Sequence, residues 1–228
     1  VRRFNRFIRR IGEAPVIYND DATKESLVAL QTALSNHGFY HARVQADTSV
    51  QKNKVHLCYN IHPGLRTYVG NIRYEFDNAD VEQAVKKTMS SSKLYRGMPL
   101  DLTLLNDERS RIINLLRDMG YYHLHKEFVS FRADTAADDY SVDLTLQFKM
   151  PTDADASSVY QKYRIRQVNV YEDVVRGEED DTTAYHGLNI YFNDHLKMYR
   201  RVYNSHTYIR PDSLYRATDL RNTYSSIN

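Results

Sequence analysis

Cysteine and tryptophan are almost absent from this sequence, which contains one Cys and no Trp among 228 residues. A single thiol excludes an intramolecular disulfide framework and every zinc site built from several cysteines. The one cysteine, Cys58, lies within the apolar, strand-like stretch 55–61. We therefore expect a thiol that is packed against apolar neighbours rather than a reactive one.

An excess of one charge and long apolar runs are also missing. The 31 Lys and Arg residues against 29 Asp and Glu residues leave a net charge of +2. This lacks the basic excess typical of a nucleic-acid-binding surface, so no nucleic-acid partner is expected. No apolar run approaches the roughly 20 residues that a membrane-spanning helix needs. The sequence begins with Val1 and shows no signal peptide, which indicates an excised fragment whose targeting signal has been removed.

The common catalytic motifs are missing as well. The sequence has no Gly-x-Gly-x-x-Gly, no phosphate-binding loop, no Gly-x-Ser-x-Gly and no His-Glu-x-x-His. These patterns mark dinucleotide, nucleotide, hydrolase and zinc-protease sites. Acid–base catalysis by two carboxylates needs different pKa values, which burial of one of them can produce. The carboxylates at 178–181 lie in a polar run, where no such burial is expected. We therefore predict a protein that is not an enzyme, has no catalytic residues and needs no cofactor.

Two groups of side chains could suggest a metal ion, and neither pattern is complete. His123 and His125 would share one face of a strand, but no third ligand has a suitable spacing. Asp134, Asp138 and Asp139 lack the oxygen spacing and the closing Glu of an EF-hand loop. A surface histidine pair and a hydrated turn are the favoured interpretations, and no metal site is predicted.

What the sequence does contain is a repeat. Leu-Ser-Asn-His-Gly-Phe-Tyr-His at 34–41 recurs as Leu-Arg-Asp-Met-Gly-Tyr-Tyr-His at 116–123. Apolar residues spaced by three and four precede each copy, as in an amphipathic helix. Gly38 and Gly120 are predicted to end these helices, because glycine adopts the left-handed C-cap without a Cβ clash. Both are therefore assigned a structural role.

Strands with alternating residues follow each copy. Apolar residues occupy every second position in 55–61 and in 142–148, which predicts strands with one buried face. The polar turns at 49–53 and 134–139 connect each strand to an extended segment before it. The sequence therefore predicts two hairpins.

The central repeat carries two helices and three strands. A strand expected at 68–76 is followed by a helix at 80–90, which Asp80 could cap, and by a second helix at 102–119. The hairpin comes next, so the order is strand, helix, helix, strand, strand. A strand that corresponds to the first of these is expected at 163–171.

This order predicts an α+β fold of tandem βααββ units, each a three-stranded sheet covered by two helices. We expect a first domain at 1–66 that lacks its first strand, a complete domain at 67–151 and a partial domain at 159–228. The first and the last unit are thus truncated. The last contains an acidic insertion near 172–192, which we interpret as a solvated loop. The polar segment 152–158 is expected to be a flexible linker.

The N-terminal segment has an amphipathic pattern. Its apolar residues within 4–11 would form one face of a helix, with arginines around the rest. We expect this helix to pack as the first helix of the truncated domain. The alternative is a contact with anionic lipid headgroups or with RNA.

The repeat, with Gly-aromatic-Tyr between the second helix and the second strand, resembles the polypeptide-transport-associated (POTRA) domain. The resemblance continues in Gly-Met-Pro-Leu at 97–100 and Asp-Glu-Arg-Ser-Arg-Ile at 107–112. It includes Ile-Arg-Pro-Asp-Ser-Leu-Tyr at 209–215, where Asp212 stands in place of the usual glycine. The segment 4–18 is similar to outer-membrane assembly proteins of the BamA and TamA type in Bacteroidetes, in the bacterial surface antigen family.

The resemblance implies the periplasmic, non-enzymatic region of an outer-membrane protein assembly or insertion factor, either BamA-like or TamA-like. Its partners would be unfolded outer-membrane protein clients, accessory assembly subunits and the protein's own C-terminal β-barrel, expected beyond residue 228. The alternative is a POTRA-like docking module of a cell-division or secretion protein, which would bind one fixed partner.

In this family the second strand of each domain lies at a sheet edge, here at 42–48 and 124–133. An edge strand offers N–H and C=O groups with which an extended client can pair largely independently of its sequence, a mode called β-augmentation. The alternative for the aromatic side chains is packing beneath the helices. The candidate binding residues are Arg43, Val44, Gln45, Lys126, Phe128, Ser130 and Arg132.

Overall fold

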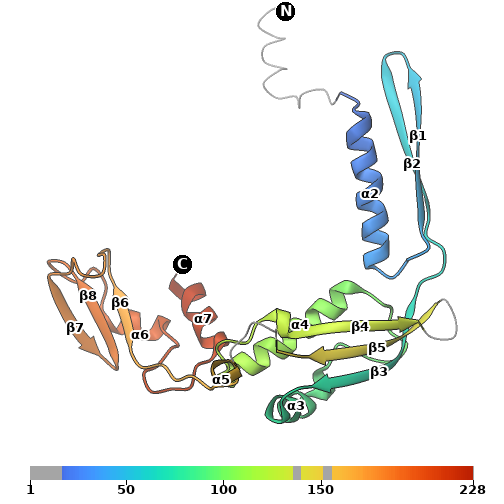
Figure 1. Ribbon diagram of the computed structural model, residues 1–228. Helices are drawn as coiled ribbons and strands as arrows, with labels where there is room; N and C mark the ends of the chain where they lie inside the picture. Colours follow the sequence, from blue (N-terminus) through green and yellow to red (C-terminus); the bar gives the residue numbers. More distant parts are fainter. Residues whose placement is uncertain (1–16, 136–139, 151–155, 228) are drawn as a thin grey trace, which may run out of the picture. The chain divides into compact units, whose positions relative to one another are not determined.

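The computed structural model describes residues 17–135, 140–150 and 156–227, which form an α+β fold (Figure 1). The chain divides into two compact units, one formed by Val1–Tyr68 with Pro99–Leu102 and the other by Val69–Met98 with Thr103–Asn228. Each unit combines α-helical structure with an antiparallel hairpin. The predicted fold class is confirmed.

The first unit contains helix α2 (Asp20–Asn36) and the hairpin of strands β1 (Arg43–Gln51) and β2 (Lys54–His62). Asn19 caps the helix, because its side-chain oxygen accepts a hydrogen bond from the Asp21 N–H at 2.9 Å. Lys52 and Asn53 connect the strands with φ values of 49° and 60°, as in a type I′ turn. The amphipathic helix expected at 4–11 lies outside the described residues.

The register of this hairpin separates an apolar face from a polar face. Val44 lies opposite Ile61 on the apolar side, whereas Cys58 lies opposite Asp47 on the polar side. Cys58 is exposed, so the expectation of a packed thiol is wrong. The strand is apolar only at every second position, and Cys58 falls between those positions. The apolar face is itself partly open, since Val55 is 38% exposed.

The second unit contains two three-stranded sheets. The first has the order β3-β5-β4 and consists of β3 (Tyr68–Phe76), β4 (Val129–Thr135) and β5 (Ser141–Phe148). Helices α3 (Ala79–Lys86) and α4 (Leu102–Asp118) come between β3 and β4 in the chain. Leu144, Leu146 and Phe148 of β5 are fully buried. The predicted order of strand, helix, helix, strand, strand is thus confirmed.

The start and the end of α3 differ from the prediction. Asn78 caps the helix in place of Asp80, because its Oδ1 accepts the N–H groups of Asp80 and Val81 at 3.0 and 3.1 Å. The helix predicted at 80–90 is also shorter. Its last turn is a separate 3₁₀ helix, Met89–Ser91.

The strand predicted at 124–133 is shorter too. β4 begins only at Val129, because Lys126–Phe128 form a 3₁₀ turn. This turn accompanies the burial of Leu124 and Phe128, which are 0% and 4% exposed. Apolar composition alone did not distinguish this buried turn from a strand.

The second sheet of this unit has the order β6-β8-β7, with β6 (Val168–Tyr171), β7 (Asp181–Tyr185) and β8 (Leu188–Phe192). β6 and β8 are parallel, and β7 is antiparallel to β8. The helices of this part are α5 (Ala156–Val159), α6 (Arg200–His206) and α7 (Ala217–Ile227). Leu188, Ile190 and Tyr203 form the centre of its core. The strand predicted at 163–171 forms only at its C-terminal end, and most of the linker expected at 152–158 lies outside the described residues.

The acidic insertion near 172–192 is therefore not a loop throughout. Residues 172–180 are irregular, but β7 and β8 follow them and complete the sheet. His186 and Gly187 connect the two strands with φ values of 47° and 83°, again as in a type I′ turn. β8 was not predicted, because its alternating pattern is short and follows the acidic run at 178–181.

Candidate functional site: open sheet edges

β1 in the first unit and β4 and β7 in the second lie at sheet edges (Figure 1). β4 pairs with β5 and β7 pairs with β8, each on one side only. The other side of such a strand presents backbone N–H and C=O groups. The edge positions expected for the segments 42–48 and 124–133 agree with the positions of β1 and β4.

The open side of β4 can be assigned residue by residue. The Lys149 N–H donates a hydrogen bond to the carbonyl oxygen of Phe128 at 2.9 Å. Hydrogen-bonded positions alternate along an antiparallel pair, so the even-numbered residues of β4 bond to β5. The odd-numbered residues, including Phe131 and Ala133, direct their N–H and C=O groups towards the open edge.

The side chains along β4 leave this backbone accessible. Ser130 and Arg132 are exposed, and the Arg132 Nε lies 3.2 Å from the Asp134 carboxylate. Phe131 is half-buried, with the guanidinium carbon of Arg109 5.7 Å from its ring centroid. Exposed charges on an edge strand disfavour pairing of the protein with itself.

Two of the predicted binding residues lie before this strand. Lys126 and Phe128 belong to the 3₁₀ turn. The Phe128 ring packs beside Phe148, with the ring centroids 6.1 Å apart, so this side chain belongs to the core and cannot contact a client at the edge. Lys126 is exposed.

The predicted residues Arg43, Val44 and Gln45 begin β1. Arg43 and Gln45 are exposed and Val44 is half-buried. Gln51 and Lys54 flank the two-residue turn, which makes them a hydrogen-bonded pair. The alternation therefore directs the backbone groups of Val44 towards the open edge of this hairpin.

Gly38 and Gly120 end α2 and α4 with φ values of 89° and 97°, the left-handed conformation that glycine adopts most readily. Each carbonyl also accepts a hydrogen bond from a later segment. The Thr67 N–H donates to Gly38 at 2.8 Å, and the Tyr163 N–H donates to Gly120 at 2.9 Å. Because the bond is between backbone groups, residue types do not reveal it in the sequence.

Hydrogen bonds join the C-terminal end of α4 to the first turn of α7 and to Tyr215 just before it. The Asp118 carboxylate accepts hydrogen bonds from the Thr218 N–H at 2.8 Å and from the Thr218 hydroxyl at 2.6 Å. It therefore caps the N-terminus of α7. Arg117 donates a hydrogen bond to the Tyr215 hydroxyl at 2.8 Å. We call these four residues the α4–α7 joint.

Aromatic rings surround this joint. The Tyr122 ring packs edge-on against Tyr215, and the His123 ring against Tyr163, with centroids 5.0 Å apart in both pairs. Edge-to-face packing of this kind is favourable. His123 therefore packs among aromatic residues, which the interpretation as a surface histidine pair with His125 did not foresee.

α4 carries a buried carboxylate that was not among the predicted site residues, although it lies in the motif at 107–112. Glu108 is fully buried and accepts hydrogen bonds from Arg111 at 2.6 Å, the Lys93 N–H at 2.8 Å and the Ser92 hydroxyl at 2.9 Å. Burial by itself raises the pKa of Glu108, but these hydrogen bonds outweigh it, and the net pKa lies below its usual value. The group is fully satisfied, so its role is structural.

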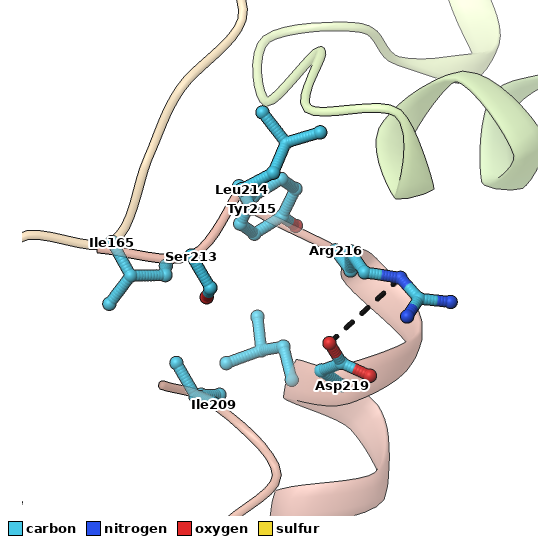
Figure 2. A pocket seen from close by; sticks show the side chains of 8 residues that line it. Ile165, Ile209, Ser213, Leu214, Tyr215, Arg216 and Asp219 are labelled. Carbon is cyan, nitrogen blue, oxygen red and sulfur yellow. Dashed lines mark ion pairs between the residues drawn. The ribbon is translucent and has the colours of Figure 1, made fainter. Parts of the chain in front are cut away.

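The cavity nearest to α7 leaves little room for a small ligand. Figure 2 shows a cavity beside α7 with Ile165, Ile209 and Ser213 in its lining. Its volume of about 20 Å³ is roughly what one water molecule needs. Within the described residues, no group of three or more His, Cys, Asp or Glu could hold a metal ion. Asp138 and Asp139 lie outside them. No helix in the described ranges is both long and apolar enough to cross a membrane.

The family comparison agrees with the resemblance seen in the sequence. Residues 9–64 match the family model of the POTRA domain, described as a surface antigen variable number repeat. The match covers less than half of the chain, and it confirms that the chain contains a POTRA region. A search of curated proteins gives no match.

Solved structures of POTRA regions show similarity at low sequence identity. POTRA domains 3–5 of BamA from Haemophilus influenzae match with 12% identity and a TM-score of 0.49, over 90% of this chain and 68% of that one. POTRA domains 1–3 of the periplasmic domain of Omp85 from Anabaena match with 12% identity and a TM-score of 0.30, over 94% and 74%. The POTRA assignment therefore rests on the family model over residues 9–64.

Proposed function

We propose that this chain is the periplasmic region of a BamA-type outer-membrane protein assembly factor. It would bind unfolded outer-membrane clients or accessory subunits by β-augmentation, as a scaffold rather than as an enzyme. The proposal divides the chain into three POTRA-like domains, at 1–66, 67–151 and 159–228. The observation that carries it is the open edge of β4.

The chemistry of this edge favours weak binding of many sequences. Phe131 and Ala133 each offer one donor and one acceptor, and each backbone hydrogen bond contributes a net of about 0.5–1.5 kcal/mol. Association costs several kcal/mol in lost freedom, so one short edge binds reversibly. Because the bonds involve only the backbone, the sequence of the client matters little. An assembly factor must bind clients of different sequence and then release them, which requires reversible binding with little sequence dependence.

The proposal can be tested at a single position of β4. Ala133→Pro removes an N–H that faces the open edge and places a ring there, whereas Ala133→Ser keeps the N–H. We expect extended β-strand peptides to bind the Pro variant at least about threefold more weakly than the Ser variant. Fluorescence anisotropy measures the affinity, and circular dichroism checks that both variants keep their secondary structure.

The range of peptides that bind separates the two functional classes. Similar affinities for several unrelated strand peptides support capture of varied clients. Binding of one peptide alone would favour the alternative, a docking module of a cell-division or secretion protein. Equal affinities of the Pro and Ser variants would contradict binding at this edge.

A further inference from the structure

We propose that β7 forms an additional peptide-binding edge, selective for an extended segment that carries an acidic residue at one end and a basic residue at the other. This inference rests on the proposed function and specifies a second site and its partner chemistry. The site lies in the inserted hairpin, on the outer side of β8 (Figure 1).

β7 carries less charge along its length than β4. The exposed Arg132 and Asp134 lie on β4, whereas β7 has Asp181 at its first position and uncharged residues at the other four. Charged side chains are a common protection of edge strands against pairing. Beyond its first residue, β7 lacks that protection.

The backbone groups on its open side follow from the turn. Tyr185 lies opposite Leu188 across the two-residue connection, which makes this a hydrogen-bonded pair. The alternation then directs the backbone groups of Thr182 and Ala184 outwards, and both residues are exposed. An incoming strand can therefore pair at these two positions.

The N-terminal end of this edge is acidic. Four acidic residues in a row, 178–181, lead into β7. The Asp181 carboxylate accepts a hydrogen bond from the outward Thr182 N–H at 2.7 Å. An incoming carbonyl oxygen would replace this carboxylate as the acceptor. The released Asp181 could then pair with a basic side chain of the incoming segment.

The C-terminal end is basic and aromatic. Arg200 donates a hydrogen bond to the Thr183 hydroxyl at 3.4 Å, and its guanidinium carbon lies 5.9 Å from the Tyr185 ring centroid. Tyr185, Tyr199, Arg200 and Arg201 line an open hollow of about 400 Å³. Tyr199 is 83% exposed. We expect a carboxylate of the incoming segment to pair with these arginines, with its stem against the tyrosine rings.

The spacing of the two charged ends defines the ligand. At about 3.3 Å per residue, the distance from Asp181 to Tyr185 is roughly 13 Å. Because Arg200 contacts both Thr183 and Tyr185, the opposite charges of the segment should lie about two to four residues apart. An antiparallel segment would have its acidic residue first, and a parallel segment would have its basic residue first.

The test uses four strand peptides that differ only in their end charges: acid-first, base-first, lysine at both ends and glutamate at both ends. Amide shifts of the whole chain are followed during titration. We expect one mixed-charge peptide to shift Thr182 and Ala184 and to bind about fivefold more tightly than either uniformly charged peptide. Silence at both amides, or equal affinity for all four peptides, would overturn the proposal.

A matched pair of variants checks the basic end. Arg201→Gln removes a charge from the hollow, and Arg96→Gln removes an exposed charge elsewhere in the second unit. Only Arg201→Gln should weaken the preferred peptide, by about two- to threefold. Equal effects of the two variants would overturn the role of the hollow. Shifts at Phe131 and Ala133 in the same spectra report on β4, so failure at β7 alone is distinguishable from failure of the proposed function.

Discussion

Gly120 is required for two reasons: its backbone has a positive φ, and Leu214 leaves no space for a Cβ. Its φ of 97° is costly for any residue with a Cβ. A Cβ there would also lie 2.8 Å from the Leu214 Cδ1. We predict that Gly120→Val lowers the free energy of unfolding by at least ~1 kcal/mol, as measured by urea denaturation.

The control for this prediction is Gly97→Val. Gly97 has a similar φ of 84°, but a Cβ there meets no atom within 4 Å. This variant carries the backbone strain without the contact, so it should be the milder of the two. Equal losses would contradict a role for the close approach to Leu214, and an unchanged stability of Gly120→Val would contradict both requirements.

Glu108 makes stability depend on pH in the acid range. Its pKa in the folded chain lies below the usual 4.5, so its contribution is complete at neutral pH. The contribution is lost as the pH falls below this value and through the folded pKa. We predict that Glu108→Gln costs about 3 kcal/mol at pH 7, because it leaves Arg111 without its buried partner. Urea denaturation from pH 7 to pH 3 should show this difference shrinking; a constant difference would contradict the assignment.

Single residues were predictable where one local rule decides the outcome. Gly38 and Gly120 follow from helix termination alone. Cys58 required the face of the strand to be known, and Phe128 required the residue at which the strand begins. Apolar composition determines neither the face nor the first residue of a strand. Cys58 is therefore exposed rather than packed, and Phe128 is buried rather than at the edge.

At the scale of elements, α3 and α7 begin with similar hydrogen bonds of different origin. Asn78 caps α3 from the adjacent residue, while Asp118 caps α7 from the end of another helix. Local caps have a fixed spacing from the helix start, so the prediction of Asp80 in place of Asn78 was wrong by only two residues. A cap supplied from 100 residues away has no such spacing.

This difference gives a paired prediction. Asp118→Ala should speed amide hydrogen exchange in the first turn of α7, and Asn78→Ala should do so in α3. Each lost cap should cost about 1 kcal/mol. The measurement is exchange followed by NMR or mass spectrometry. Faster exchange in α3 on replacing Asp118, or no change in α7, would contradict the assignment of the caps.

The strands also divide into those that the sequence predicted and those that it did not. β3 and β5 were predicted because their alternating pattern extends over eight or nine residues. β7 and β8 contain five residues each, which is too short for a period of two to stand out beside an acidic run. The edge that carries the further inference was therefore hidden in the sequence.

At the scale of the whole molecule, the α4–α7 joint should make the two sheets of the second unit tumble as one body. Independent motion is the usual expectation when domains share a small interface. We predict equal rotational correlation times for amides in β5 and β8, measured by NMR relaxation. Tyr215→Ala removes the hydrogen bond from Arg117 and should shorten the time for β8.

Tyr208→Ala provides the control, because Tyr208 is 48% exposed and lies outside the joint. It should leave the two correlation times equal. Unequal times in the unaltered chain, or equal times after Tyr215→Ala, would contradict the assignment of this joint.

The most direct test of edge binding is amide hydrogen exchange along β4 with and without a saturating extended peptide. The account predicts slower exchange at Phe131 and Ala133, whose N–H groups face the open edge and would become hydrogen-bonded. Ser130 and Arg132 already bond to β5 and should change little. Unchanged exchange at Phe131 and Ala133, or equal slowing at all four residues, would contradict β-augmentation at this strand.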